Sequence, residues 1–282
     1  MATVIFFLVH WQASVFFQSF FQHRYCAHRQ FTMGKRTEKV AHFLAWFVGG
    51  SSYLTPRAYA VLHRMHHAYS DTPKDPHSPV HHPNVFKMMW RTKTIYQDLR
   101  LGRVVPEARF DGEVPSWPLL DQKLNGWGTT FTFAAGYAGI YALLGASWWM
   151  YVFLLPLHIG LGPIHGAIVN YFGHKLGYRN FETKDSSRNT LVFDVLTMGE
   201  LFQNNHHRFG QSPNFGARAY EIDPCYQVMR LLGAMKIIDM SGSQKMKLPA
   251  KGKPEVVEEE SAPSIAAPAA RSTPVDGGGV RA

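Results

Sequence analysis

The chain has 282 residues and a formal net charge of +9, but its charges are unevenly distributed. No Asp, Glu, Lys or Arg occurs from Met1 to Gln22, or between Lys123 and Lys175. A soluble domain rarely leaves such long stretches uncharged, so the composition excludes an ordinary soluble protein. With membrane segments present, the basic charge is explained by topology and anionic headgroups, and we expect no nucleic-acid partner.

Three stretches are predicted to cross a membrane, because roughly 20 apolar residues are needed to span a hydrocarbon core about 30 Å thick. The first lies near residues 3–22, and the second uncharged stretch holds two more, near 126–144 and 148–172. Residues 40–54 are apolar but too short to cross, and Gly49 and Gly50 interrupt them. We expect an interfacial or re-entrant segment there.

Further helices are predicted over residues 57–70 and over 84–102, the latter lying on the membrane surface. Basic residues outnumber acidic ones in residues 23–123, which the positive-inside rule places in the cytoplasm. The second and third crossings then return the C-terminal part to the same side as residues 23–123, opposite the N-terminus.

The predicted fold class is therefore an all-α integral membrane protein, with about three transmembrane helices and a cytoplasmic helical cap. Residues 1–240 are predicted to form one domain. Residues 241–282 become polar and then rich in Pro, Ala and Gly, which predicts a flexible C-terminal tail.

Histidines gather in three short motifs, HRYCAH at 23–28, HRMHH at 63–67 and QNNHH at 203–207. The predicted topology brings all three motifs to the cytoplasmic face. Imidazole binds zinc, copper, nickel and iron, so the residue type alone does not identify the metal. The number of histidines exceeds a four-ligand zinc site and indicates two metal ions.

Helix geometry predicts how the histidines of each motif converge. His63, His66 and His67 fall within an arc of roughly 100° on an α-helix, so they can face one point. His23 and His28 are five residues apart, roughly 140° on an ideal helix. They converge only if the helix ends, tightens or bulges between them, and we predict such an irregularity.

With these motifs the sequence resembles the membrane fatty acyl-CoA desaturase family, specifically the delta-9, stearoyl-CoA desaturase-like type. Further matches are DPH at 75–77, NYFGHKLGYR at 170–179 and GELFQNNHH at 199–207. The resemblance covers roughly residues 10–238. One departure is Gln203, which stands where many members have a histidine and is similar to the form seen in bacterial members.

The resemblance implies which residues hold the metal. The implied iron ligands are His23, His28, His63, His66, His67, His174, His206 and His207. Asn170 would join through a bound water, and Gln203 is a weaker candidate ligand. Asp75 and His77 would support the ligands. Arg64, Arg91 and Lys93 are candidates for attracting a phosphate-bearing substrate headgroup.

The implied activity is O2-dependent desaturation of a long-chain fatty acyl substrate, with two iron ions as cofactor and O2 as co-substrate. The implied substrate is an acyl-CoA, desaturated at delta-9. The sequence has no iron–sulfur, dinucleotide-binding or cytochrome b5 motif, so a separate ferredoxin, rubredoxin or cytochrome b5-like donor is expected. The implied location is a bacterial inner membrane, with the active site and C-terminus cytoplasmic.

Three other interpretations remain open at this point. Similar histidine motifs could serve a membrane fatty-acid, sterol or alkane hydroxylase, which would add a hydroxyl group. A metal transporter or haem-carrying membrane protein would also use histidines, although transport ligands usually lie at mid-membrane. A non-catalytic lipid-binding scaffold would account for Gln203.

Overall fold

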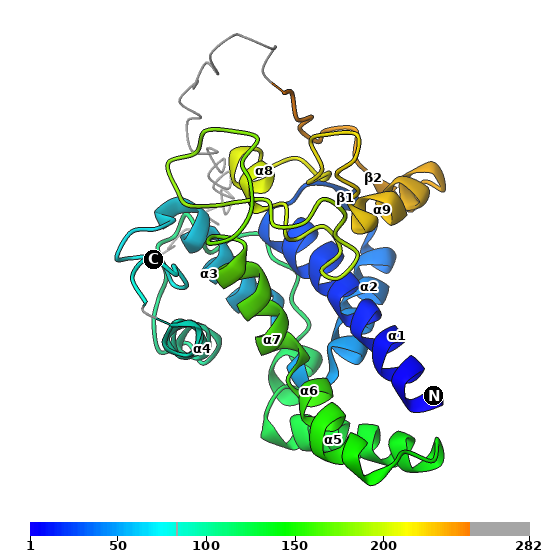
Figure 1. The fold of residues 1–282 in the computed structure, drawn as a ribbon. Helices are drawn as coiled ribbons and strands as arrows, with labels where there is room; N and C mark the ends of the chain where they lie inside the picture. The colour runs from blue at the N-terminus through cyan, green and yellow to red at the C-terminus, as the bar shows by residue number, and fades with distance from the viewer. Residues whose placement is uncertain (83, 249–282) are drawn as a thin grey trace, which may run out of the picture.

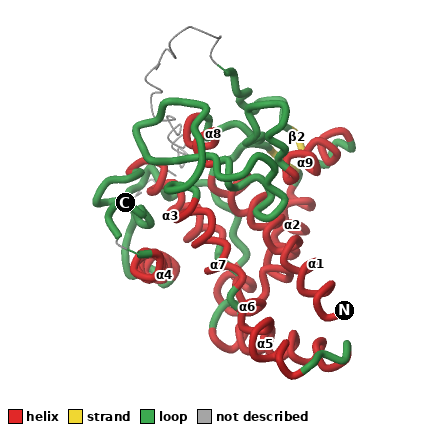
Figure 2. The backbone as a smooth tube through the Cα atoms, viewed as in Figure 1, coloured by secondary structure: helices red, strands yellow, loops and turns green. Residues whose placement is uncertain are grey.

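The computed structural model describes residues 1–82 and 84–248, and within them the chain is mostly helical (Figures 1 and 2). The α-helices are α1 (Ala2–Phe17), α2 (Lys35–Gly49), α3 (Pro56–Tyr69), α4 (Val85–Arg100), α5 (Trp127–Leu143), α6 (Leu155–Ile159), α7 (Leu161–Ala167), α8 (Gln203–Arg208) and α9 (Pro224–Ala234). The π-helical segments are η1 (Gln18–Ala27), η3 (Leu119–Lys123), η4 (Met150–Leu154) and η5 (Ile168–Phe172), and η2 (Gly50–Ser52) is a 3-10 turn. The predicted all-α class is confirmed at this level.

The molecule is elongated, with helices at one end and mostly loops at the other. Figure 1 shows α5 and α6 at one end, α8 and α9 at the other, and α1 and α7 running between them. Figure 2 shows that the end containing α8 is built mainly from loops. We call this loop-rich end the cap.

The first predicted span is an unbroken helix that is longer than expected. α1 continues directly into η1, so Ala2–Ala27 forms one helical segment, long and apolar enough to cross a membrane. The predicted span near 3–22 lies within it. The helix therefore carries the first histidine motif at its own end, on the cap side.

The last predicted span is bent, which the sequence analysis did not anticipate. Met150–Ile159 and Leu161–Phe172 meet at an angle of 69°, and together they are long and apolar enough for one crossing. Gly160 stands at the break and Pro163 follows it, and glycine is a poor helix former while proline lacks the backbone N–H of a helical hydrogen bond. α5 matches the span expected near 126–144 in position, but its 17 residues give about 26 Å, slightly less than the hydrocarbon thickness.

The predicted interruption at Gly49 and Gly50 is present. α2 ends at Gly49, and Gly50 has a φ of +52°, a backbone conformation that glycine adopts at little cost. A Cβ at Gly50 would collide with the hydroxyl of Tyr137, so a glycine here also allows α5 to approach. The chain then turns through η2 into α3, whose N-cap is Thr55 and whose first residue is Pro56.

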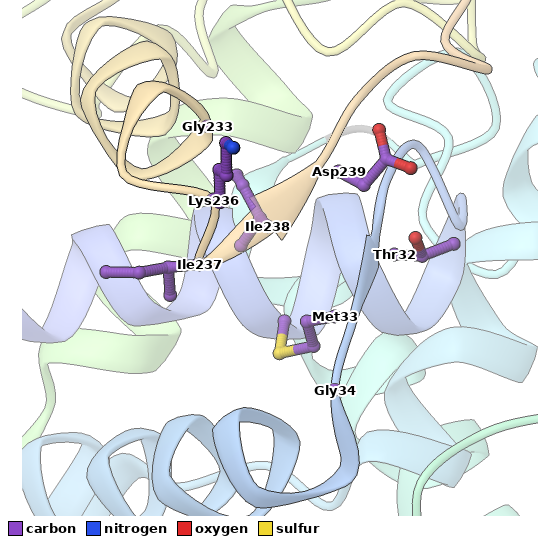
Figure 3. A pocket seen from close by; sticks show the side chains of 8 residues that line it. All are labelled: Thr32, Met33, Gly34, Gly233, Lys236, Ile237, Ile238 and Asp239. Carbon is purple, nitrogen blue, oxygen red and sulfur yellow. The ribbon is translucent and has the colours of Figure 1, made fainter.

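Two short strands, β1 (Thr32–Met33) and β2 (Ile238–Asp239), pair antiparallel and tie the chain after η1 to the segment after α9. A pair of two-residue strands is too short to be predicted from the sequence. A cavity of about 360 Å³ lies between these strands and the end of α9 (Figure 3). No histidine lines it, so it is separate from the site described below.

The proposed division into residues 1–240 and a tail stays a prediction. Most of the predicted tail, residues 249–282, lies outside the described residues.

Candidate metal centre

The π-helix η1 brings the two histidines of the first motif together. Its hydrogen bonds join residues five apart, and the His28 N–H donates to the His23 carbonyl at 3.1 Å. The wider turn therefore places His28 almost above His23, with ring centroids 4.9 Å apart. The predicted irregularity at 23–28 is confirmed, and it takes the form of a π-helix.

The second motif lies on α3, which packs against η1. The Nε2 atom of His63 is 2.9 Å from Nε2 of His23 and 2.7 Å from Nε2 of His28. Tyr59, one turn earlier, stacks on the His63 ring with an interplanar angle of 5°. The spacing of the histidines in HRMHH thus predicts which face of α3 meets the histidines of η1.

The third motif forms the short helix α8, which two buried asparagines hold in place. The side-chain amide oxygen of Asn204 accepts from the backbone N–H groups of Asn180 and Phe181, at 2.8 and 2.9 Å. The side-chain amide nitrogen of Asn205 donates to the Phe215 backbone carbonyl and to the Glu221 carboxylate, both at 2.8 Å. These bonds anchor a helix that is too short to be stable alone.

Seven histidines of the three motifs, together with His174 just after η5, form two adjacent clusters, and the ligand atoms within each cluster lie within 4.8 Å of one another. The five-histidine cluster contains His23, His28, His63, His67 and His206. The three-histidine cluster contains His66, His174 and His207. All eight histidines that the sequence indicated as metal ligands are therefore gathered in one region.

The distances between imidazole nitrogens suit a metal ion. Nε2 of His206 lies 3.1 Å from that of His23 and 3.0 Å from that of His67, and the His66–His207 pair is 3.3 Å apart. Two imidazoles bound to one ion at about 2.1 Å and at right angles would have nitrogens about 3 Å apart. The Nε2 atom of His174 is buried and has no hydrogen-bond partner, as expected for a ligand.

Carboxylates orient one histidine from each motif through its other ring nitrogen. Nδ1 of His23 is 2.5 Å from Glu200, and Nδ1 of His207 is 2.7 Å from Asp185. Asp75 accepts from Nδ1 of His66 at 2.9 Å. A proton held on Nδ1 leaves the Nε2 lone pair free for a metal, which is the usual arrangement around metal-bound histidines.

Burial favours the neutral form of four of the cluster imidazoles. It lowers the pKa of His63, His66, His67 and His206 well below the ordinary value, and neighbouring histidines lower it further. Burial alone would raise the pKa of Glu200, but His23 and Arg24 outweigh it and bring that pKa to about 2. At neutral pH the site thus combines neutral nitrogen donors with ionised carboxylates behind them, which favours cation binding.

Gln203 lies beside the three-histidine cluster. It is one turn before His207 on α8. Its Cγ packs closely against Gly173, because a Cβ atom added at Gly173 would lie only 2.7 Å from the Gln203 Cγ. Its amide nitrogen donates to the Glu200 carbonyl at 2.6 Å, which fixes the side chain.

The other predicted site residues differ in how they are placed. Asp75 contacts Nδ1 of His66, and the His77 ring lies 4.1 Å from the His66 ring, centroid to centroid. Both ring nitrogens of His77 are buried, and neither has a hydrogen-bond partner among the described residues. Asn170 is half-buried in η5, and no hydrogen bond to its side chain is found within the described residues.

The structure corrects the headgroup assignment for Arg64. Its guanidinium donates to the backbone carbonyls of Ala27 and Cys26, at 2.9 and 2.8 Å, and to those of Phe110 and Gly112, both at 3.0 Å. It therefore caps the end of η1 and is not free for a substrate. Arg91 donates to the Pro73 carbonyl at 2.9 Å, and the exposed Lys93 ammonium lies over the Trp90 ring.

The comparisons with known proteins agree with this site. Residues 1–232 match the model of the fatty acid desaturase family, and the chain belongs to that family. It is thus an oxidoreductase that desaturates fatty acyl chains, and members of the family are associated with membranes.

Among its relatives is Delta-9 desaturase-like 5 protein of Arabidopsis thaliana, 30% identical over 76% of this chain and 68% of the relative. A hex-5-enoyl-[acyl-carrier protein] acetylenase of Moorena producens is 28% identical over 77% of this chain and 69% of its own length. An acyl-CoA C20 Delta5-desaturase of Anemone leveillei is 28% identical over 74% of this chain and 64% of its own length.

Proposed function

We propose that the protein desaturates a long-chain acyl-CoA at delta-9, using two iron ions bound by the eight clustered histidines. The observation that carries this proposal is the pair of adjacent clusters, in which imidazole nitrogens from η1, α3, α8 and the end of the bent helix converge. Two neighbouring ions of the kind that imidazole binds would account for both clusters, whereas a single four-coordinate zinc ion could bind at most four of the eight histidines.

The bound irons would supply the redox chemistry that lets O2 act on an unactivated C–H bond. Each turnover takes two hydrogens from adjacent methylenes of the substrate, two electrons from a donor protein and two protons from water. One O2 is thereby reduced to two waters, and one cis double bond forms. The electrons would come from a separate ferredoxin, rubredoxin or cytochrome b5-like protein.

The residues of the chain hold and shield this centre. Glu200, Asp75 and Asp185 would keep the Nδ1 protons of three ligands in place, which fixes both the tautomer and the ring orientation. Burial of the histidines excludes water, so that reactive species formed from O2 are not lost to solvent. Asn170 would act through a water, and Arg91 and Lys93 would attract the headgroup.

We further propose that α1 with η1, α5, and the bent helix from Met150 to Phe172 each cross the membrane. Their order places the cap in the cytoplasm and the N-terminus on the other side, in a bacterial inner membrane. The absence of Asp, Glu, Lys and Arg from residues 1–22 and 124–174 and the basic excess of residues 23–123 support this topology.

Gln203 is proposed as an oxygen ligand of the metal at the three-histidine cluster. Because an amide oxygen is a weaker donor to iron than an imidazole, this metal should be the more easily removed of the two. Replacement by Gln203→His is expected to slow its loss to a chelator by at least about 10-fold, the lower end of what a supporting contact contributes. Metal content after timed chelator treatment measures this loss.

The matched control is Gln211→His, which adds a histidine at an exposed position on the loop after α8. It should lose metal at the same rate as the unaltered protein. Equal rates for all three proteins would show that Gln203 does not contact the metal.

The reaction is tested with purified protein, a reducing donor, O2 and stearoyl-CoA. Mass spectrometry should find a product lighter by two hydrogens, with its double bond at delta-9. A product heavier by one oxygen would identify a hydroxylase. Turnover of the acyl carrier protein thioester or of a phospholipid, but not of the CoA ester, would overturn the substrate assignment.

A further inference from the structure

Residues 191–196 form an unusually apolar stretch of the cap surface. Their sequence is Leu-Val-Phe-Asp-Val-Leu, and the five apolar side chains are 36% to 54% exposed. Runs of exposed apolar residues are rare on soluble surfaces and mark sites of interaction. We call this stretch the apolar loop.

The outward orientation of these side chains follows from the polar interior of the loop. The fourth residue of the run, Asp194, is fully buried, and its carboxylate accepts from the backbone N–H groups of Thr197 and Leu201, both at 2.9 Å. The Thr197 hydroxyl donates to the same carboxylate. Because Asp194 turns inward to close the loop, Phe193 and Val195 on either side of it are directed outward.

The segment that leads into the apolar loop is bonded to the turn at the cap end of the bent helix. The Arg188 N–H donates to the Gly173 carbonyl at 2.8 Å, and the Thr190 hydroxyl donates to the Leu176 carbonyl at 2.9 Å. Phe172 and Leu176 are themselves 40% and 54% exposed. The chain therefore enters the apolar loop from the end of a proposed membrane span, where apolar side chains are also exposed.

Basic groups border this apolar surface. Lys175 is exposed, and its ammonium lies 4.3 Å from the centroid of the Tyr171 ring. Arg188 lies just before the loop and donates to the Gly177 carbonyl at 3.2 Å. Apolar side chains bordered by cations and a tyrosine are the combination found where a protein meets the headgroup region of a bilayer.

We propose that the apolar loop inserts its side chains into the lipid bilayer beside the bent helix and so attaches the cap to the membrane surface. The proposal rests on the membrane topology proposed above, because the continuity of the apolar surface with the last span identifies lipid as the occupant. The same loop is joined through the Asp194–Leu201 bond to the turn that precedes α8. Its insertion would therefore help to hold the third histidine motif at the membrane face.

The test uses an environment-sensitive fluorophore on Phe193→Cys, and on Gln211→Cys as the exposed polar control. Both native cysteines, Cys26 and Cys225, are buried in the fold, so the introduced thiol is the accessible one among the described residues. The full chain is reconstituted into vesicles of phosphatidylcholine and phosphatidylglycerol, with or without lipids that carry a nitroxide on the acyl chain. Iodide serves as the aqueous quencher.

Fluorescence from position 193 should be lost to the nitroxide lipid and retained against iodide, whereas position 211 should behave in the opposite way. Quenching of position 193 by iodide alone would overturn the proposal. Shielding from both quenchers, with energy transfer between differently labelled copies, would assign the surface to a second copy of the chain and overturn it equally. Metal content and desaturation are measured on the same samples, so failure of this proposal is distinguishable from failure of the proposed function.

Discussion

A protein carrying His63→Ala and His67→Ala is expected to lose the metal of the five-histidine cluster and all measurable desaturation. The Nε2 atom of His63 lies within 2.9 Å of those of His23 and His28, so its loss removes the centre of the cluster. Removing a supporting partner of a metal ligand typically costs about 10- to 100-fold, and loss of two ligands should exceed this. Iron per chain and product formation measure the two effects.

The control for this variant is His81→Ala. His81 is exposed, lies outside both clusters and contacts the Asp71 carbonyl at 2.9 Å. It should retain full iron content and activity. Two irons per chain in the double variant would contradict the assignment of these histidines.

Replacement of Arg24 by methionine is expected to destabilise the protein by about 3–5 kcal/mol, the usual cost of removing one partner from a buried ion pair. Arg24 is fully buried and binds Asp223 at 2.7 Å and Glu200 at 2.8 Å, with its guanidinium 3.8 Å from the Phe215 ring centroid. Methionine fills similar space but leaves two buried carboxylates without a cation. The midpoint of thermal unfolding in detergent measures the effect.

Arg57→Met provides the matched comparison. Arg57 pairs with Asp111, but both side chains are partly exposed, at 47% and 31%, so water screens the pair. Exposed pairs contribute about 0–1 kcal/mol, and the midpoint should change little. Equal destabilisation by the two substitutions would show that the buried network around Arg24 has no special role.

The histidine clusters could be predicted from the sequence because their information is local. The spacing of His63, His66 and His67 fixes one face of a helix, and the five-residue spacing of His23 and His28 requires a bulge, which the structure supplies as η1. The long uncharged stretches likewise located the apolar helices. In each case a few neighbouring residues determine the feature.

What the sequence did not reveal depends on contacts between distant segments. Glu200 was part of a matched motif but had no assigned role, and Asp185 stood in no motif, although both support ligands. Arg24 pairs with carboxylates 176 and 199 residues away along the chain. Arg64 was a candidate for the substrate headgroup, but the fold brings four backbone carbonyls to its guanidinium.

The central claim is most directly tested by gas chromatography–mass spectrometry of total fatty acids from a desaturase-deficient host. The host expresses either the unaltered chain, together with a compatible electron donor, or the same chain with His66→Ala and His67→Ala. We predict a monounsaturated fatty acid with the unaltered chain alone, with its double bond located by derivatisation. The same monounsaturated acid from both chains, or hydroxy acids from the unaltered one, would contradict desaturation at a centre held by these histidines.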